Sequence, residues 1–182
     1  CLTQSAVDNL NVLPSNVNLS GAEIDLIGVE GREFILKKEL DKIKELYDYI
    51  IIDCPPSLNV LTVNAMVAAD SVIVPIQCEY YALEGLSQLI HTINLIQERL
   101  NDKLEIDGIV FTMYDSRTNL SSEVVENVKS NVHINIYDTV IPRNVRLAEA
   151  PSYGLPIHMY DGKSAGAVAY ENLAKEILKN NK

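Results

Sequence analysis

The chain has 182 residues and a formal net charge of −10, from 15 basic and 25 acidic side chains. This length suits one domain with a sizeable core, and the composition is that of an ordinary globular protein without an apolar run near membrane-span length. An acidic excess argues against nucleic acid, but residues 1–111 carry 7 basic and 17 acidic residues whereas residues 112–182 carry 8 of each. A local basic surface therefore stays open in the second part.

The cysteines and histidines define no metal centre or disulfide framework. Cys1, Cys54 and Cys78 are odd in number and far apart, and the three histidines have no HExxH spacing. This usage indicates a reducing cytoplasm. The opening Cys1-Leu2-Thr3-Gln4 lacks an initiator Met and any signal-peptide pattern. We expect a chain cut from a longer protein.

The first third of the chain predicts short elements. Residues 10–14 predict a strand that Pro14 stops. Ser20-Gly21-Ala22-Glu23 has the Ser-x-x-Glu pattern of a capping box and predicts a helix start. After Gly31, a second helical stretch carries one apolar face, formed by Leu36, Leu40, Ile43 and Tyr47.

A buried strand is predicted at residues 49–53, because Tyr49-Ile50-Ile51-Ile52 is apolar without alternation and ends at Asp53. In parallel sheets, ligands bind at the carboxyl ends of strands, where Asp53 falls. Two prolines follow and stiffen the loop. Asp53 is therefore a candidate for orienting a metal ion or its water ligands, and the alternative is an Asp that caps the next helix.

The remainder of the chain alternates helices and strands. The predicted helices cover residues 58–69, 82–100, 120–132 and about 167–178, the predicted strands cover 71–76 and 106–113, and 134–141 is a further apolar segment; a Pro-, Gly- and Ser-rich loop is predicted over 149–166. This order predicts an α/β fold, with a mostly parallel sheet flanked by helices on both faces, as a single domain over residues 1–182. The loops at 53–58, 77–84, 113–119 and 142–152 then share one edge of the sheet.

Three of these loops carry motifs: Asp-Cys-Pro-Pro-Ser at 53–57, Gln-Cys-Glu-Tyr-Tyr-Ala-Leu-Glu-Gly-Leu at 77–86, and Ile-Pro-Arg-Asn-Val-Arg-Leu-Ala-Glu-Ala-Pro-Ser-Tyr-Gly at 141–154. Together and in this order they resemble the ParA/Soj chromosome-partitioning ATPases, which belong to the MinD-like class of P-loop NTPases. The resemblance covers essentially the whole chain. It implies the P-loop NTPase fold, incomplete at the N-terminus, and ATP and Mg²⁺ as cofactors of the complete protein.

The resemblance also implies residue roles. Asp53 resembles the Walker B-type carboxylate that holds Mg²⁺ through a water, and Pro55, Pro56 and Ser57 resemble the switch loop that responds to the γ-phosphate. The adenine-side residues of the family match Met113, Pro142, Arg143 and Asn144. Without the family, Pro142 is a plain strand terminator and Met113 a core residue.

DNA contacts are implied at Arg117 and Arg146, because related partitioning ATPases bind DNA without sequence preference as dimers. The alternative is a surface arginine that pairs with a nearby acid such as Asp115 or Glu149. The implied partners are non-specific DNA, a ParB/Spo0J-type centromere-binding protein and a second subunit in the presence of ATP. The implied setting is the cytoplasm, on the nucleoid, without membrane.

One expected motif is missing. The family's phosphate loop has the form Lys-Gly-Gly-x-x-x-Lys-[Ser/Thr], whose backbone amides and lysines hold phosphates, and the sequence contains no such stretch. Asp161-Gly162-Lys163-Ser164 lacks the earlier glycine and precedes the last helix, so it is a false match. We expect this chain to be inactive as an ATPase. The alternatives are a non-catalytic DNA- or partner-binding module, a MinD-like division-site ATPase, and an iron–sulfur relative.

Overall fold

The computed structural model describes residues 2–55, 57–80 and 82–180. Two compact units make up the chain, Cys1–Ala69 and Asp70–Lys182, and each is described by itself. That the whole chain acts as one domain stays a prediction. Among the described residues, no helix is long and apolar enough to cross a membrane.

The first unit consists of short elements. Strands β1 (Thr3–Gln4) and β2 (Asn11–Val12) pair antiparallel, which confirms the predicted strand at 10–14 in its central two residues. The helices that follow are 3-10 helices at Val17–Gly21, Arg32–Phe34 and Lys44–Leu46 and α-helices α1 (Ala22–Asp25), α2 (Ile35–Leu40) and α3 (Val60–Ala68). The second helical stretch is therefore broken into pieces, while the helix predicted at 58–69 is confirmed.

The predicted capping box at Ser20 is wrong. Ser20 lies inside the 3-10 helix, and its hydroxyl donates to the carbonyl oxygen of Val17. Gly21 is the N-cap of α1 and makes no side-chain cap hydrogen bond. The 3-10 turn starts earlier, because the Asn16 side chain accepts a hydrogen bond from the backbone N–H of Asn18 at 2.9 Å. The cap is thus one turn upstream of the predicted position.

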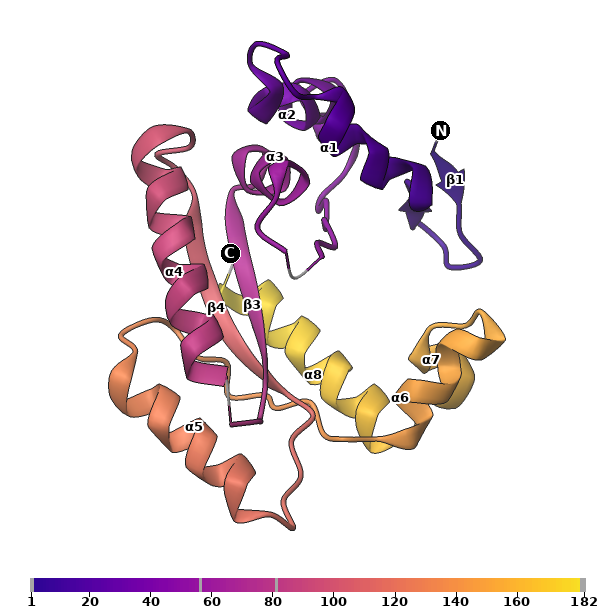
Figure 1. Cartoon of the computed structure of the whole chain (residues 1–182). Helices are drawn as coiled ribbons and strands as arrows, with labels where there is room; N and C mark the ends of the chain where they lie inside the picture. Colours follow the sequence, from indigo (N-terminus) through magenta and orange to yellow (C-terminus); the bar gives the residue numbers. More distant parts are fainter. Residues whose placement is uncertain (1, 56, 81, 181–182) are drawn as a thin grey trace. The chain divides into compact units, whose positions relative to one another are not determined.

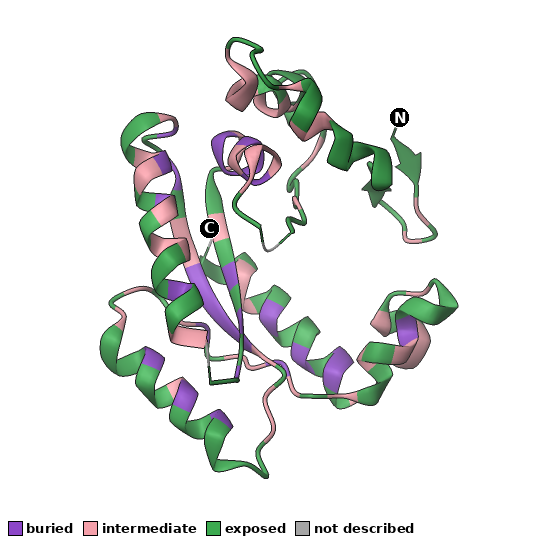
Figure 2. Ribbon diagram, in the orientation of Figure 1, coloured by how far each residue is buried: buried purple, intermediate pink, exposed green. Residues whose placement is uncertain are grey.

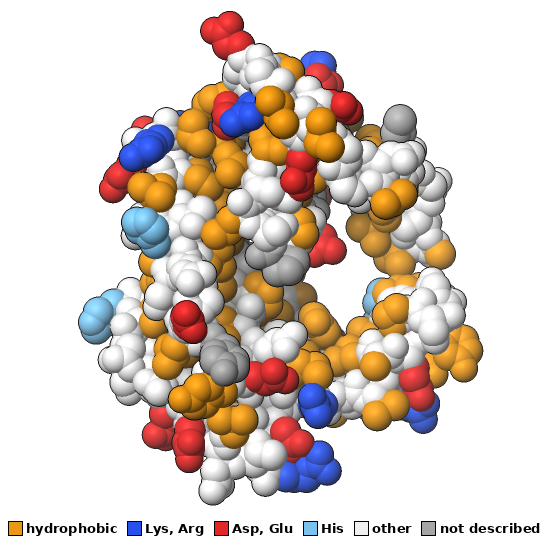
Figure 3. All heavy atoms as spheres, viewed as in Figure 1, with side chains coloured by type: hydrophobic (Ala, Val, Ile, Leu, Met, Phe, Trp, Pro, Cys, Tyr) orange, Lys and Arg blue, Asp and Glu red, His pale blue; other side chains and the backbone are white. Residues whose placement is uncertain are grey.

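The predicted buried strand at 49–53 is also wrong. These residues belong to no strand, and Ile51 is 92% exposed. A strand becomes regular when a neighbouring strand takes up its N–H and C=O groups. No segment among the described residues makes backbone hydrogen bonds to 49–53. The apolar run therefore lies open, as do many apolar side chains that Figure 3 shows on this unit.

The second unit has the predicted α/β order. It contains β3 (Ser71–Gln77), α4 (Ala82–Arg99), β4 (Glu105–Thr112), α5 (Asn119–Asn131), α6 (Val145–Glu149), a 3-10 helix (Ala150–Tyr153), α7 (Ile157–Asp161) and α8 (Ala165–Asn180). β3 and β4 are parallel, with Val74 opposite Ile109 and an irregularity between Val72 and Ile73. The parallel sheet is confirmed, although it is smaller than predicted.

Residues 134–142 run parallel to β4 on its other side. Ile136 bridges to Ile109 and Pro142 bridges to Tyr114. Between these two bridges, the backbone N–H groups of Asp138 and Thr139 donate to the Glu176 carboxylate of α8, at 2.7 and 3.1 Å. These two donors are therefore not available to β4, and the segment forms isolated bridges instead of a regular strand.

Helices cover both faces of this sheet, with α4 and α5 on one side and α8 on the other (Figure 1). Buried residues lie on their inward faces and at positions 108–111 of β4 (Figure 2). On the α8 side, the core is a cluster formed by Val110, Tyr137, Ile141, Ala169 and Leu173. On the other side, α4 buries Leu86, Ile93 and Ile96. The layered arrangement expected from the sequence is thus confirmed for this unit.

The loop predicted over 149–166 is wrong in part, because it contains the 3-10 helix and α7. Each of these elements has a proline at its start, Pro151 in the first turn and Pro156 as N-cap. Proline fixes φ near the helical value and lacks only a donor that a first turn leaves unused, so it starts a helix as readily as it breaks one. The functional loop predicted at 142–152 likewise contains α6.

Candidate functional site

A pocket of about 730 Å³ lies at the carboxyl edge of the sheet in the second unit. It is lined by residues of β3 and the loop after it, by the first half of α4, by the loop after β4 with the start of α5, and by Arg143. The polar and sulfur-bearing residues that line it are Gln77, Cys78, Glu79, Tyr80, Met113, Asp115, Thr118, Ser121 and Arg143. The prediction that loops 77–84, 113–119 and 142–152 share one edge is therefore confirmed within this unit.

Met113 lines this pocket in a rare backbone conformation. Its φ of 54° is left-handed, although it is not a glycine, and its side chain is 38% exposed. Hydrogen bonds on its carboxyl side hold it there: the Tyr114 N–H donates to the Ile141 carbonyl at 3.1 Å, and the Arg143 N–H donates to the Tyr114 carbonyl at 2.9 Å. Strain of this kind is characteristic of functional sites. It turns Met113 out of the core and toward the pocket.

The other adenine-side candidates divide between two places. Arg143 lines the same pocket as Met113, whereas Pro142 lines a different pocket, between residues 138–142 and α8. Asn144 is the N-cap of α6, where its Oδ1 accepts the backbone N–H of Arg146 at 2.9 Å. Its amide nitrogen makes no hydrogen bond to the described residues and could still donate to a base. The nucleotide role of these four residues stays a prediction.

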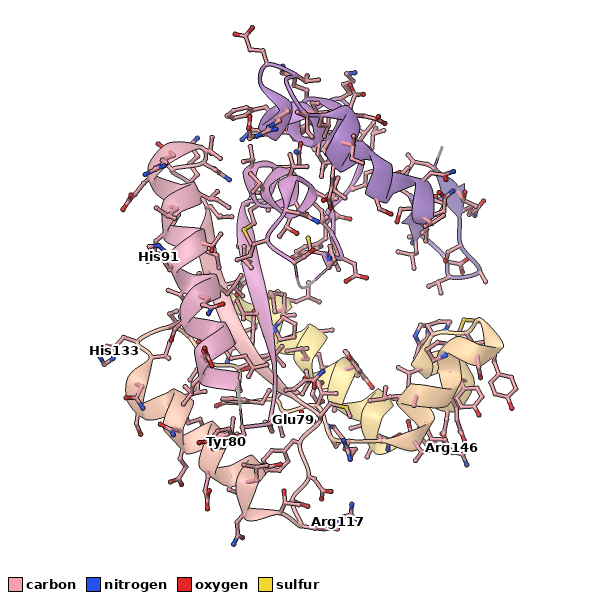
Figure 4. All side chains as sticks on the ribbon, viewed as in Figure 1. Glu79, Tyr80, His91, Arg117, His133 and Arg146 are labelled. Carbon is pink, nitrogen blue, oxygen red and sulfur yellow. The ribbon has the colours of Figure 1, made fainter. Side chains whose placement is uncertain are left out.

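Arg117 forms a two-pronged ion pair with Asp115. Its Nε and Nη2 donate to the two carboxylate oxygens at 2.8 and 2.7 Å, and its backbone N–H donates to Oδ1 at 3.0 Å. The pair raises the pKa of Arg117 and, through these hydrogen bonds, holds the pKa of Asp115 well below its usual range. Figure 4 shows Arg117 at the tip of its loop.

Arg146 on α6 is paired in a similar way. Its Nη1 lies 2.9 Å from the Glu149 carboxylate and its Nε lies 3.5 Å from Asp161. Tyr160 donates a hydrogen bond of 3.0 Å to the same Glu149 oxygen and stacks on Tyr153, with 4.9 Å between ring centroids. The hydrogen bond from Arg146 is the main cause that lowers the pKa of Glu149. Both predicted DNA-contact arginines are thus paired with acids.

In the first unit, Asp53 is exposed and makes no hydrogen bond or ion pair that involves the described residues. It does not cap the next helix, because Asn59 does so by accepting from the N–H groups of Leu61 and Thr62, both at 3.1 Å. A free carboxylate suits Mg²⁺, which keeps several waters and takes one or two protein carboxylates. Among the described residues, no group of three or more acidic, His or Cys side chains could hold a metal ion.

The switch-loop candidates flank this carboxylate. Pro55 is exposed, and Pro56 lies outside the described residues. Ser57 is tied to the start of α3, because its hydroxyl accepts from Asn59 Nδ2 at 3.1 Å and its carbonyl accepts from Thr62 Oγ1 at 2.6 Å. These hydrogen bonds attach Ser57 to the first turn of α3.

Sequence reasoning missed the pocket-lining role of Cys78 and named Asp115 only as an alternative partner. The Cys78 side chain is 3% exposed and its burial raises the pKa of the thiol, which makes it a poor nucleophile. For Asp115, a signal was present. Asp followed by Ser-Arg-Thr suits a turn in which the carboxylate accepts the N–H two residues later, as observed.

The sequence and the fold are similar to those of known proteins. A family model described as an AAA domain matches residues 1–106. The sporulation initiation inhibitor protein Soj of Bacillus subtilis is 56% identical over 176 residues, which are 97% of this chain and 70% of that protein. Cobyrinic acid a,c-diamide synthase of Mycobacterium smegmatis, solved with a bound ATP analogue and magnesium, is 38% identical with a TM-score of 0.83, and the match covers 98% of this chain and 65% of that one.

The cell division ATPase MinD of Pyrococcus furiosus shares the fold, with a TM-score of 0.76 at 24% identity. The fold is therefore that of the MinD-like P-loop NTPases. Within that class, the chain belongs to the ParA/Soj family of chromosome-partitioning ATPases. It spans about two thirds of the length of the relatives that it matches.

Proposed function

We propose that this chain is part of an ATP-dependent partitioning protein that dimerises with ATP, binds DNA without sequence preference and is stimulated by a ParB-type partner. In this proposal, Asp53 would help to hold Mg²⁺, and Pro55, Pro56 and Ser57 would respond to the γ-phosphate. Met113, Pro142, Arg143 and Asn144 contact the adenine side, and Arg117 and Arg146 contact DNA phosphates. Magnesium would supply charge neutralisation at the phosphates.

The observation that carries this proposal is the convergence of the loops after β3, β4 and Pro142 around one pocket, with Met113 strained toward it. In open α/β sheets, ligands bind at such carboxyl edges. The loop that carries Arg117 and the helix α6 that carries Arg146 supply exposed guanidinium groups for contacts with DNA phosphates. In Figure 3, Lys or Arg side chains adjoin acidic ones along the lower edge of this unit.

Two arginines in each subunit can supply only a weak, salt-sensitive DNA site, since each phosphate contact contributes separately through counterion release. Dimerisation would double the contacts and convert the second subunit's contacts into intramolecular ones. The balanced charge of residues 112–182 is compatible with this role despite the overall charge of −10.

The test measures DNA affinity at a series of salt concentrations. The probes are fluorescent duplexes of unrelated sequence, each about 30 base pairs long, or three helical turns. We expect the 182-residue chain to bind all duplexes alike. The double variant Arg117→Ala/Arg146→Ala should bind every duplex more weakly and by the same factor. The slope of log affinity against log salt concentration should fall in magnitude by about 2. Lys175→Ala, which removes an exposed cation paired with Glu171 on α8, is the matched control. Equal affinity of the double variant and wild type would refute the DNA role.

A second candidate is a non-catalytic DNA-binding module. It is favoured by one specific observation, the absence from the sequence of a phosphate-cradling loop. The two candidates differ in their response to nucleotide. If ATP with Mg²⁺ changes the DNA affinity of wild type but not that of Asp53→Ala, the nucleotide-responsive function is supported. If the DNA affinity of neither protein changes, the non-catalytic module is supported.

A further inference from the structure

We propose that Asp115 is an internal competitor for DNA phosphate: its carboxylate holds Arg117 in a closed ion pair and thereby sets the DNA affinity of this loop. The inference rests on the proposed DNA function and concerns its regulation. It adds a residue with a role opposite to that of the arginine, on the same turn.

The geometry of the pair resembles that of a bound phosphate. Asp115 accepts Nε–H and one Nη2–H of Arg117 side by side, at 2.8 and 2.7 Å. A guanidinium offers five N–H donors, and this planar, two-pronged arrangement is the one that it also uses for phosphate. The carboxylate therefore occupies one of the guanidinium edges that a DNA phosphate would use. It also places a negative charge beside any phosphate that binds to the remaining edge.

Asp115 is the fixed member of the pair and Arg117 the mobile one. The Asp115 side chain is 19% exposed, whereas that of Arg117 is 84% exposed. The Asp115 N–H donates to Ser121 Oγ at 3.2 Å, and its carbonyl accepts from both the N–H and the hydroxyl of Thr118 at 3.1 Å. Ser121 is itself buried. When a phosphate arrives, the arginine moves and the carboxylate stays.

The same arrangement recurs at the second arginine. Glu149 accepts from Arg146 while the Tyr160 hydroxyl anchors the same oxygen, so the acid is again the better-held partner. Because Glu149 also bonds Tyr160 and Arg146 faces Asp161 as well, a change there alters several contacts at once. Asp115 gives the cleaner test, since its carboxylate forms an ion pair with Arg117 and with no other described residue.

The size of the effect follows from the exposure of the pair. Exposed ion pairs are weak, and releasing Arg117 from one should strengthen DNA binding by about threefold to fivefold at low salt. The gain should shrink as salt rises, because both the pair and the phosphate contact are screened.

The experiment is a double-mutant cycle on the 182-residue chain, with a duplex probe at about 50 mM salt. Asp115→Asn keeps the shape of the side chain and an oxygen for the Arg117 N–H, but removes the charge. The cycle compares wild type, Asp115→Asn, Arg117→Ala and the double variant that carries both substitutions. Glu171→Gln, which removes one acid from an exposed pair with Lys175, is the charge-matched control.

We expect Asp115→Asn to bind more tightly than wild type and than Glu171→Gln, and the gain to vanish when Arg117 is alanine. An unchanged or weakened Asp115→Asn overturns the competitor role, and so does a gain that persists without Arg117. The proposed function fails in a different way: Arg117→Ala would then bind DNA as tightly as wild type. Far-ultraviolet circular dichroism of each variant verifies folding, and a misfolded Asp115→Asn would overturn the inference by showing that the carboxylate is structural.

Discussion

At the scale of single residues, Gly108 in β4 allows close packing in the second unit. A Cβ at this position would lie 2.8 Å from Cε2 of Tyr137 and 2.9 Å from Nδ2 of Asn135. The Tyr137 ring cannot yield, because it is 2% exposed and its hydroxyl donates a 2.6 Å hydrogen bond to Asp107. The glycine therefore lets residues 134–142 approach β4.

We predict that Gly108→Ala lowers the free energy of unfolding by about 1–3 kcal/mol, because overpacking forces the ring or the backbone to shift. Gly85→Ala is the matched control. Its Cβ would meet nothing within 4 Å, and it lies in α4, so it should stabilise by about 0.5–1 kcal/mol. Urea midpoints of both variants measure the difference. Equal midpoints would show that the close approach to Tyr137 is not required.

Glu176 is a second residue whose contribution can be isolated. Burial raises its pKa, but the N–H groups of Asp138 and Thr139 outweigh this, and the net pKa lies below the ordinary 4.5. Because the folded pKa is depressed, the stabilisation is complete above the unfolded pKa and is lost as pH falls through the folded value.

Glu176→Gln should therefore cost about 1 kcal/mol at neutral pH, a typical value for hydrogen bonds to a half-buried carboxylate. Its stability should also depend less on pH below about 4.5 than that of wild type. Thermal melts between neutral and acid pH measure both effects, with Glu98→Gln on the exposed side of α4 as control. A parallel loss of stability in Glu176→Gln and wild type on acidification would contradict the assignment.

At the scale of elements, α3 depends on a single side chain for its start. Asn59 accepts from Leu61 and Thr62 and also donates from Nδ2 to Glu23 and Ser57. We predict that Asn59→Ala destabilises this helix by about 1 kcal/mol and speeds amide exchange at Leu61 and Thr62. Asn59→Ser keeps a cap acceptor and should retain most of the protection; identical exchange in the two variants would contradict the capping role.

The long elements of the second unit were predictable because their apolar residues repeat with a clear period over many residues. The stripe on α4 and the apolar runs of β3 and β4 specify helix and strand without help from distant parts of the chain. The segment at 49–53 has an equally apolar pattern, but strand formation depends on a partner, which is not a local property. The 3-10 helix at Ala150–Tyr153 and α7 were missed for another reason: a Pro-, Gly- and Ser-rich composition predicts a loop, although proline can also start a helix.

The candidate site was partly predictable for a related reason. Parallel strand order alone places loops 77–84, 113–119 and 142–152 on one edge. The left-handed backbone of Met113 depends on tertiary hydrogen bonds to residues 141–143, which the sequence does not display. The capping role of Asn144 is local, because its side chain accepts the N–H of Arg146, two residues later. The ion pairs of Arg117 and Arg146 with Asp115 and Glu149 are short-range, and the sequence spacing had already suggested them as alternatives.

At the scale of the whole molecule, the sequence carries the carboxylate, switch, adenine-side and DNA-contact positions of a partitioning ATPase, as proposed, without a phosphate-cradling loop. Positioning and charge stabilisation of the phosphates provide nearly all the catalysis of phosphoryl transfer, and backbone amides and lysines of that loop supply much of it. We therefore expect that Asp53 supports no ATP hydrolysis in this chain.

ATP hydrolysis by the purified 182-residue chain, in the presence of Mg²⁺ and with or without DNA, tests this account most directly. The account predicts no phosphate release above the blank, and the same result for Asp53→Ala. Steady turnover by wild type that Asp53→Ala abolishes would contradict it.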